Sequence, residues 1–119
     1  MKSADKAELF VHYWRIVLGE SIEVPQPVPE YRFDETRKWR LDWAWPDDSI
    51  RVGVEVDGGV FAPGGGRHAK DSDREKTNAL SAAGWLIFRF SPQMLNNDPH
   101  ACIMMVAETV KRRMGSHGS

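Results

Sequence analysis

Three carboxylates in residues 40–59, RLDWAWPDDSIRVGVEVDGG, form the most chemically informative pattern of the sequence. Asp42 lies in one strand-like segment, and Glu55 and Asp57 lie in the next. If the two strands pair, these acids converge on one face of a sheet. Like charges this close are costly unless a positive charge lies between them, and a hard cation with oxygen ligands usually supplies it. The pattern therefore favours a divalent-metal site over its simpler alternative, acids on a solvated sheet face.

The convergence of the acids depends on strand alternation, because successive side chains of a strand point to opposite faces. In the first segment Asp42 shares a face with Arg40 and Ala44, and in the second Glu55 and Asp57 share one. The residues expected on the opposite, apolar face are Trp39, Leu41, Trp43, Trp45, Val52, Val54 and Val56. The acids and the apolar core are thus predicted on opposite sides of the sheet.

Several elements must position these strands. Apolar residues at helical spacing predict a first helix over 4–18, which Gly19 ends. A proline-rich connection then leads to a short strand at 31–33. The two better strands follow at 38–45 and 51–57, and the sequence PDDS between them suits a turn. The acids therefore lie on a predicted hairpin.

After the hairpin, the sequence predicts a loop and a second helix. The glycine-rich stretch 58–70 lacks the glycine spacing of a P-loop or a dinucleotide fingerprint. Ser72 as N-cap and Glu75 three residues later form a capping box, and Gly84 ends the helix. Ser72 therefore marks the expected start of this helix.

Two charged residues of this helix, Asp73 and Lys76, lie beside its core-facing stripe. They either point toward the sheet, and so toward the acids, or form an ordinary ion pair on the helix surface. Spacing alone leaves both alternatives open.

The last part of the chain completes an α/β domain. The apolar run WLIFRF, 85–90, predicts a buried strand reached by a crossover. A final helix opens at Asp98 and Pro99 and ends before Gly115. Its expected buried residues are Ile103, Val106, Ala107, Val110 and Met114. The predicted fold class is α/β, a mixed β-sheet flanked by helices.

Composition sets the outer limits. The chain of 119 residues, 41% hydrophobic, fits one folded domain over 1–114, and the polar tail 115–119 resembles the remnant of an expression tag. No apolar run is long enough to span a bilayer, so we expect an intracellular protein without a membrane partner. Cys102 is the single cysteine and is expected to be an inert core thiol. A net charge of −1 does not indicate a nucleic-acid binder, yet a basic rim around an acidic centre would give the same sum.

The chain resembles the PD-(D/E)xK nuclease superfamily over about residues 8–95. The resemblance is carried by WRLDWAWP, VEVDGG, GGRH, EKTNAL and GWLIFRF, in that order. Within the superfamily, the chain is most similar to the very-short-patch-repair and restriction-like group, with phage Holliday-junction resolvases nearest. The resemblance implies a restriction-endonuclease-like core and a Mg²⁺- or Mn²⁺-dependent DNA endonuclease that acts in recombination or repair. It also implies branched DNA as substrate, a homodimer, and a phage-encoded protein in the bacterial cytoplasm.

The resemblance implies metal-ligand roles for Asp42 and Glu55, with the backbone carbonyl of Val56 as a third ligand. The family lysine is expected two residues after Glu55, where this chain has Asp57. Either Asp57 adds a ligand and a second metal ion replaces the charge of the lysine, or the positive charge comes from elsewhere. Lys76 is the preferred substitute.

His68, in the glycine-rich loop, is the second candidate for this cation, with a solvated surface residue as the simpler reading. Glu8 is carried over more loosely, as the first-helix carboxylate of the family. Asp73 is a candidate to hold Lys76 or to assist a second metal ion.

The expected DNA-contacting residues surround the acids. They are Arg40, Arg67, His68, Lys70, Asp73 and Arg74. Trp43, Trp45 and Phe61 are either core residues or part of a dimer interface. Three alternatives remain open: a mismatch-nicking or restriction-type endonuclease, a catalytically silent DNA-binding module of the same fold, and a structural protein whose acids are merely solvated.

Overall fold

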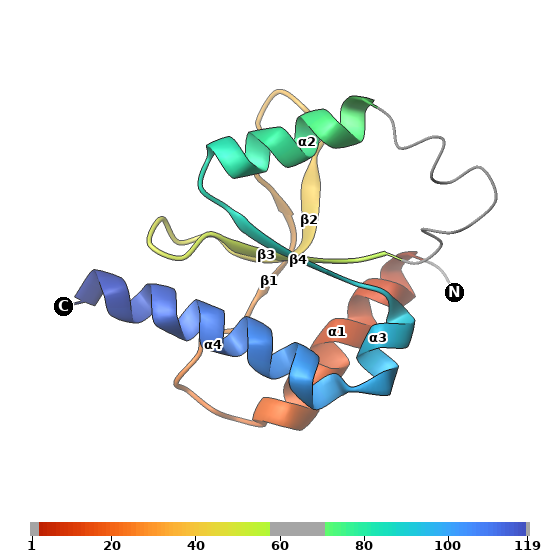
Figure 1. Cartoon of the computed structure of the whole chain (residues 1–119), viewed down its shortest axis with the longest axis vertical. Helices are drawn as coiled ribbons and strands as arrows, with labels where there is room; N and C mark the ends of the chain where they lie inside the picture. Colours follow the sequence, from red (N-terminus) through yellow and green to blue (C-terminus); the bar gives the residue numbers. More distant parts are fainter. Residues whose placement is uncertain (1–2, 58–70, 119) are drawn as a thin grey trace.

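The computed structural model describes residues 3–57 and 71–118 of the chain. They form a mixed α/β fold in which a four-stranded sheet is flanked by helices, as Figure 1 shows. The elements are α1 (Ser3–Leu18), β1 (Val28–Arg32), β2 (Arg40–Trp45), β3 (Val52–Val56), α2 (Asp71–Ala82), β4 (Leu86–Phe90), α3 (Pro92–Asn97) and α4 (Pro99–Gly118).

The sheet has the strand order β1-β2-β3-β4. The first three strands form an antiparallel meander, whereas β4 runs parallel to β3 with Glu55 beside Arg89. Parallel neighbours require a crossover connection, and α2 lies in that connection. The predicted order of strand, strand, helix and strand is confirmed, and so is the predicted crossover.

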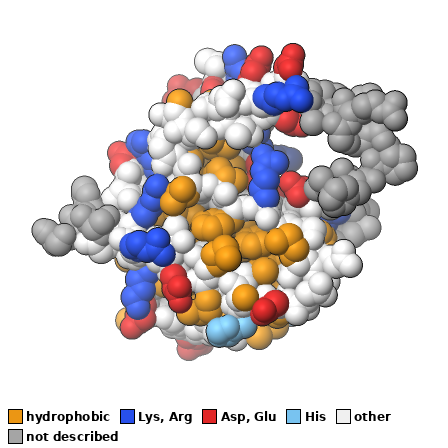
Figure 2. Space-filling model, viewed as in Figure 1, with side chains coloured by type: hydrophobic (Ala, Val, Ile, Leu, Met, Phe, Trp, Pro, Cys, Tyr) orange, Lys and Arg blue, Asp and Glu red, His pale blue; other side chains and the backbone are white. Residues whose placement is uncertain are grey.

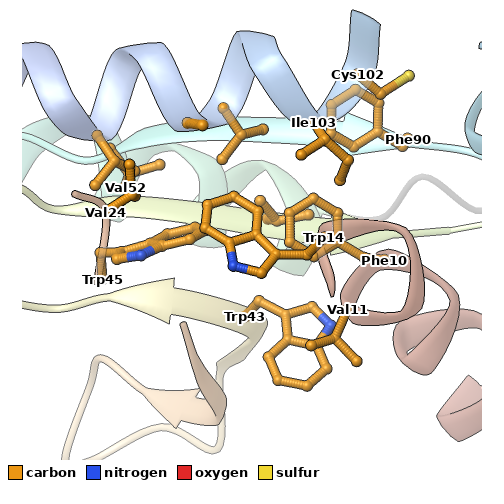
Figure 3. Packing of buried hydrophobic residues seen from close by; sticks show 14 of the residues in the cluster. Phe10, Val11, Trp14, Val24, Trp43, Trp45, Val52, Phe90, Cys102 and Ile103 are labelled. Atoms are coloured by element: carbon orange, nitrogen blue, oxygen red, sulfur yellow. The ribbon is translucent and has the colours of Figure 1, made fainter. Parts of the chain in front are cut away.

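Helices cover the two faces of the sheet unequally. In Figure 1, α2 lies on one face and α1, α3 and α4 lie on the other. The main core lies between the sheet and these three helices, where Figure 3 shows Phe10, Trp14 and Trp45 packed together. Val52, Val54 and Val56 point into this core, as strand alternation predicts. The opposite face of β3 is thereby left for Glu55.

The starts and ends of the helices follow from local residue chemistry. Gly19 and Gly84 take positive φ values of 61° and 83°, which glycine adopts without steric cost, and each ends a helix as predicted. Asp98 accepts the amide of Ala101 at 3.1 Å and so caps α4, also as predicted. The short helix α3 was not predicted, although Ser91 caps it and Pro92 opens it. Its six residues are too few for periodicity to reveal.

β1 begins earlier than the expected strand at 31–33. It spans Val28–Arg32 and includes Pro29. A proline is tolerated there because β1 is an edge strand of the sheet, where one row of backbone amides needs no partner. The prolines of this segment were interpreted only as excluding a helix, so the predicted start of β1 came too late.

The face assignment of Leu41 was wrong. We expected it beside Trp43 and Trp45, but it is fully buried under α2 with Ala44 and Leu80. The reason lies in Gly53, since a Cβ atom there would lie 2.7 Å from Leu41 Cδ1. Leu41 therefore fills space that the glycine leaves free, which strand alternation cannot show.

Two helix boundaries also differ from expectation. α2 begins at Asp71, so Ser72 lies inside its first turn instead of capping it. α4 continues through Gly115 to Gly118, and Met114 is 36% exposed instead of buried. Its neighbour Arg113 already contacts the turns at Ile50 and Gly84, so Met114 lies at the end of the sheet and its side chain has little to cover.

β4 forms the second edge of the sheet. Figure 2 shows hydrophobic side chains gathered on this side of the molecule, between α2 and the helices of the other layer. Leu86 of β4 is 41% exposed.

Among the described residues, no helix is long and apolar enough to cross a membrane.

Candidate functional site

A cleft of about 440 Å³ lies between the first turns of α2 and the ends of β2 and β3. It is lined by Lys38, Trp39, Arg40, Asp42, Glu55, Val56, Asp57, Ser72, Asp73 and Lys76. The three acids predicted to converge, Asp42, Glu55 and Asp57, therefore share one cleft. The hairpin brings the acids together, and the crossover helix adds the lysine.

Asp42 marks the place where two strands stop pairing. The register between β2 and β3 runs from Trp45↔Val52 to Trp43↔Val54. At the next position the Asp42 carboxylate takes over from the backbone and accepts the amide of Val56 at 2.8 Å. The side chain thus fixes its own position against β3. Asp42 also lines the cleft.

Glu55 and Lys76 form an ion pair that joins β3 to α2. Both side chains are largely buried, with 13% of Glu55 and 18% of Lys76 exposed. Lys76 donates to Oε1 of Glu55. Of the two alternatives for Lys76, the structure therefore favours the one in which the lysine points to the sheet and the acids.

Arg89 is a member of this cluster that the sequence analysis did not name. It lies beside Glu55 in the parallel register of β3 and β4. Its guanidinium lies 3.5 Å from Glu55 Oε2 and 3.7 Å from Asp57 Oδ2. The polar residue inside the apolar run WLIFRF was the available signal, since a buried strand seldom carries an arginine without a partner.

The acids perturb one another. Burial raises the pKa of Asp42, and the nearby charge of Glu55 raises it further, while the hydrogen bond from Val56 opposes the shift. Burial also raises the pKa of Asp57, against the attraction of Arg89. The positive charge of Lys6, in the first turn of α1, also lowers the pKa of Asp57. A cleft that disfavours its own negative charges is one that a cation would stabilise.

The available ligands suit a metal ion that binds few protein groups and keeps several of its waters. Across residues 3–57 and 71–118, no cluster of three or more His, Cys, Asp or Glu side chains is arranged as a metal cage. Asp42 and Glu55 instead offer two carboxylates on one cleft wall. Mg²⁺ commonly binds one or two carboxylates and keeps several waters, so these residues fit that ion and do not fit a closed structural site.

The backbone of Val56 is oriented so that its carbonyl could serve as the third ligand. A strand residue points its N–H and C=O toward the same neighbour, and the Val56 amide points to Asp42. Its carbonyl therefore faces the same side as the Asp42 carboxylate. Val56 also lines the cleft.

One rim of the cleft is cationic and aromatic. Lys38, Trp39 and Arg40 line it in succession. The expected place of Trp39 on the apolar face was wrong, because β2 begins only at Arg40 and strand alternation does not extend to Trp39. Arg37 lies over the Trp39 ring at 4.5 Å and also pairs with Glu75 of α2 at 2.9 Å. Arg40, expected to contact DNA, has 61% of its side chain exposed beside the acids. Lys38 and Arg40 thus place two exposed positive charges at the rim, next to the acids.

Other expected site residues lie farther out. Asp73 lines the cleft, but Arg74 pairs with Asp71 at 3.1 Å and lines a neighbouring groove with Thr77 and Arg89. Glu8 is exposed on α1 and is absent from the described residues that line the cleft. The structure therefore brings Asp73 to the acids and does not bring Glu8 or Arg74 there.

The dimer-interface alternative for two tryptophans was wrong. Trp43 and Trp45 are 6% and 2% exposed, and each indole N–H donates to a backbone carbonyl at 2.7 Å. Both are core residues. Four further predictions fall outside the described residues, namely those for Phe61, Arg67, His68 and Lys70.

Comparisons with known proteins add nothing to this geometry. No protein-family model matches the chain, and neither a curated protein nor a solved structure is significantly similar to it.

Proposed function

We propose that the protein is a divalent-metal-dependent DNA endonuclease that cleaves branched DNA, in the manner of a Holliday-junction resolvase. The carrying observation is that Asp42 and Glu55 share one cleft with the largely buried ammonium group of Lys76. Phosphodiester hydrolysis needs an activated water and neutralised charge on the phosphate, which a carboxylate-bound metal ion and a nearby lysine can supply. The exposed cations Lys38 and Arg40 at the rim suit the negatively charged backbone of DNA.

Asp42 and Glu55 would hold Mg²⁺ or Mn²⁺, with the Val56 carbonyl as a further oxygen ligand and Asp57 beside them in the cleft. Such an ion, when bound, lowers the pKa of a coordinated water and neutralises charge on the phosphate. Lys76 places its ammonium in the same cleft, where it stabilises the negative charge that develops during attack. In the resembled family this role belongs to a lysine at the position that Asp57 occupies in this chain.

The arrangement of the chain supports a restriction-endonuclease-like core as part of this proposal. A helix precedes an antiparallel meander, and a crossover helix then leads to a strand parallel to β3. Asp42 and Glu55 lie on the two central strands, as the resemblance implies, whereas the lysine comes from the crossover helix and not from the strand position that the family uses. A homodimer follows from two coordinated cuts in a junction, and no surface among the described residues is assigned to it.

Cleavage assays test the proposal directly. Purified protein with Mg²⁺ or Mn²⁺ should cut a labelled four-way junction, and Asp42→Asn or Glu55→Gln should lower the rate at least about a hundredfold. Glu108→Gln is the matched control, because Glu108 is an exposed acid on α4 and does not line the cleft. Four-way junctions, flaps, mismatched and plain duplexes that all survive intact would show that the protein is no nuclease.

A catalytically silent DNA-binding module is the second candidate, favoured by Asp57 at the position of the family lysine. Calorimetry separates the two. The nuclease should bind Mn²⁺ in the absence of DNA, and Glu55→Gln should abolish that binding. A silent module should bind junction DNA equally well in a chelator and should show no heat with Mn²⁺.

A further inference from the structure

Glu55 is held by two cations on two different oxygens. Lys76 of α2 takes Oε1, and Arg89 of β4 approaches Oε2 at 3.5 Å. With only 13% of the Glu55 side chain exposed, these partners and not solvent determine its rotamer. This carboxylate is therefore contacted from both α2 and β4.

The two cations reach Glu55 from different sides. Among the described residues, those that line the acidic cleft include Lys76 but not Arg89. Arg89 instead lines the grooves between α2 and β4, next to Thr77. Lys76 thus stands inside the cleft, whereas Arg89 supports Glu55 from behind it.

Arg89 also connects Glu55 to Asp57. Its Nη2 faces Glu55 and its Nη1 faces Asp57 at 3.7 Å. The guanidinium is planar and rigid, so one group that pairs with both carboxylates favours a particular spacing between them, which a lysine ammonium does not. The strand beneath is equally fixed, since the Asp57 amide donates to the Phe90 carbonyl at 3.0 Å.

We propose that Arg89 is a positioning residue of the metal site, which orients Glu55 and sets its spacing from Asp57 so that the carboxylates can bind a divalent cation. This inference rests on the proposed function, because it concerns the same acids. It assigns no contact between Arg89 and the substrate. Arg89 acts through the two carboxylates.

Positioning and simple charge predict opposite changes in metal affinity. Arg89 is a positive charge near the site, so if charge alone mattered, its removal would strengthen the binding of a divalent cation. If Arg89 orients the carboxylates, its removal weakens that binding despite the added negative charge. Residues that orient metal ligands typically contribute a factor of about 10 to 100 in affinity.

The experiment titrates Mn²⁺ into the protein without DNA by calorimetry. We expect Kd to rise about tenfold in Arg89→Met and by a smaller factor in Arg89→Lys, which keeps the charge but loses the fork. Arg15→Met, an exposed arginine on α1, removes the same charge elsewhere and should leave Kd unchanged. Melting curves of each variant show whether it is folded before its Kd is compared.

The outcomes separate this inference from the proposed function. Tighter or unchanged Mn²⁺ binding in folded Arg89→Met overturns the positioning role and leaves the nuclease proposal intact. A wild-type protein that binds no divalent cation and cuts no DNA refutes the proposed function itself. Folded Arg89→Lys supplies the same comparison if Arg89→Met does not fold, and a Kd equal to that of the wild type would then overturn the inference.

Discussion

The Asp42 carboxylate replaces a backbone partner for Val56, whose amide it accepts at 2.8 Å where β2 and β3 stop pairing. This arrangement is costly, because burial and the charge of Glu55 raise the pKa of Asp42. The ionised form that a metal site needs is thus the form that the fold disfavours. Asp42 therefore offers a direct test of whether stability has been given up for function.

We predict that Asp42→Asn stabilises the metal-free protein at pH 7. The asparagine Oδ1 can still accept the Val56 amide, while the buried charge and its repulsion from Glu55 disappear. Urea unfolding should show a higher midpoint for the variant with an unchanged slope. Asp48→Asn, whose side chain is 93% exposed and pairs with Arg51, should not raise the midpoint.

The pH dependence of this difference follows from the sign of the shift. Because the folded pKa of Asp42 lies above its ordinary value of 3.8, the native state binds more protons between these two pKa values. Wild-type stability from this group therefore falls as pH rises through that window. The advantage of Asp42→Asn should be absent below the ordinary pKa and complete above the raised one. An advantage that is equal at pH 3 and pH 7 would contradict this origin.

Lys76 should compete with metal for Glu55. Its ammonium occupies Oε1 of the carboxylate, so a cation bound to that oxygen must overcome this ion pair. We expect Lys76→Met to tighten Mn²⁺ binding severalfold while junction cleavage falls by about a hundredfold or more. Calorimetry measures the first effect and single-turnover cleavage the second.

The control for Lys76 is Lys111→Met, which removes an exposed ion pair with Glu23. This variant should leave both Mn²⁺ binding and cleavage unchanged. Weaker Mn²⁺ binding in Lys76→Met would show that Lys76 orients Glu55 as Arg89 does, and that the two cations do not divide their roles.

Sequence periodicity predicted the elements that carry the site, and strand alternation predicted that Glu55 and Asp42 share a face. Helical spacing placed Lys76 beside the core-facing stripe, so an orientation toward the sheet was one of the two alternatives that the sequence left open. Arg89 could not be assigned a partner, since the pairing of β4 with β3 is set by tertiary packing across residues that are far apart in sequence. The face of Leu41 was predicted wrongly for a related reason, because strand alternation takes no account of the space that a glycine leaves free.

Gly53 is predicted to be essential for packing. A Cβ atom there would lie 2.7 Å from Leu41 Cδ1 and 2.9 Å from Ile87 Cδ1, so both side chains must shift in Gly53→Ala. Overpacking of this kind costs about 1–3 kcal/mol of unfolding free energy. Denaturant unfolding measures it, and Gly115→Ala is the control because nothing lies within 4 Å of its added Cβ. In a Leu41→Ala background, which empties the contested space, Gly53→Ala should cost less unfolding free energy than it does in the wild type. An equal cost in both backgrounds would show that the strain lies in the backbone of β3.

Arg113 is predicted to hold α4 against the end of the sheet. Its guanidinium donates to the Ile50 carbonyl at 2.6 Å and to the Gly84 carbonyl at 3.0 Å, and so joins three parts of the chain. Arg113→Met leaves these carbonyls without a charged donor, which we expect to lower the unfolding free energy by about 1–3 kcal/mol. Arg112→Met, at an exposed neighbouring position, removes the same charge and should cost far less. Equal losses in the two variants would mean that net charge on α4, and not the bridge, accounts for the stability.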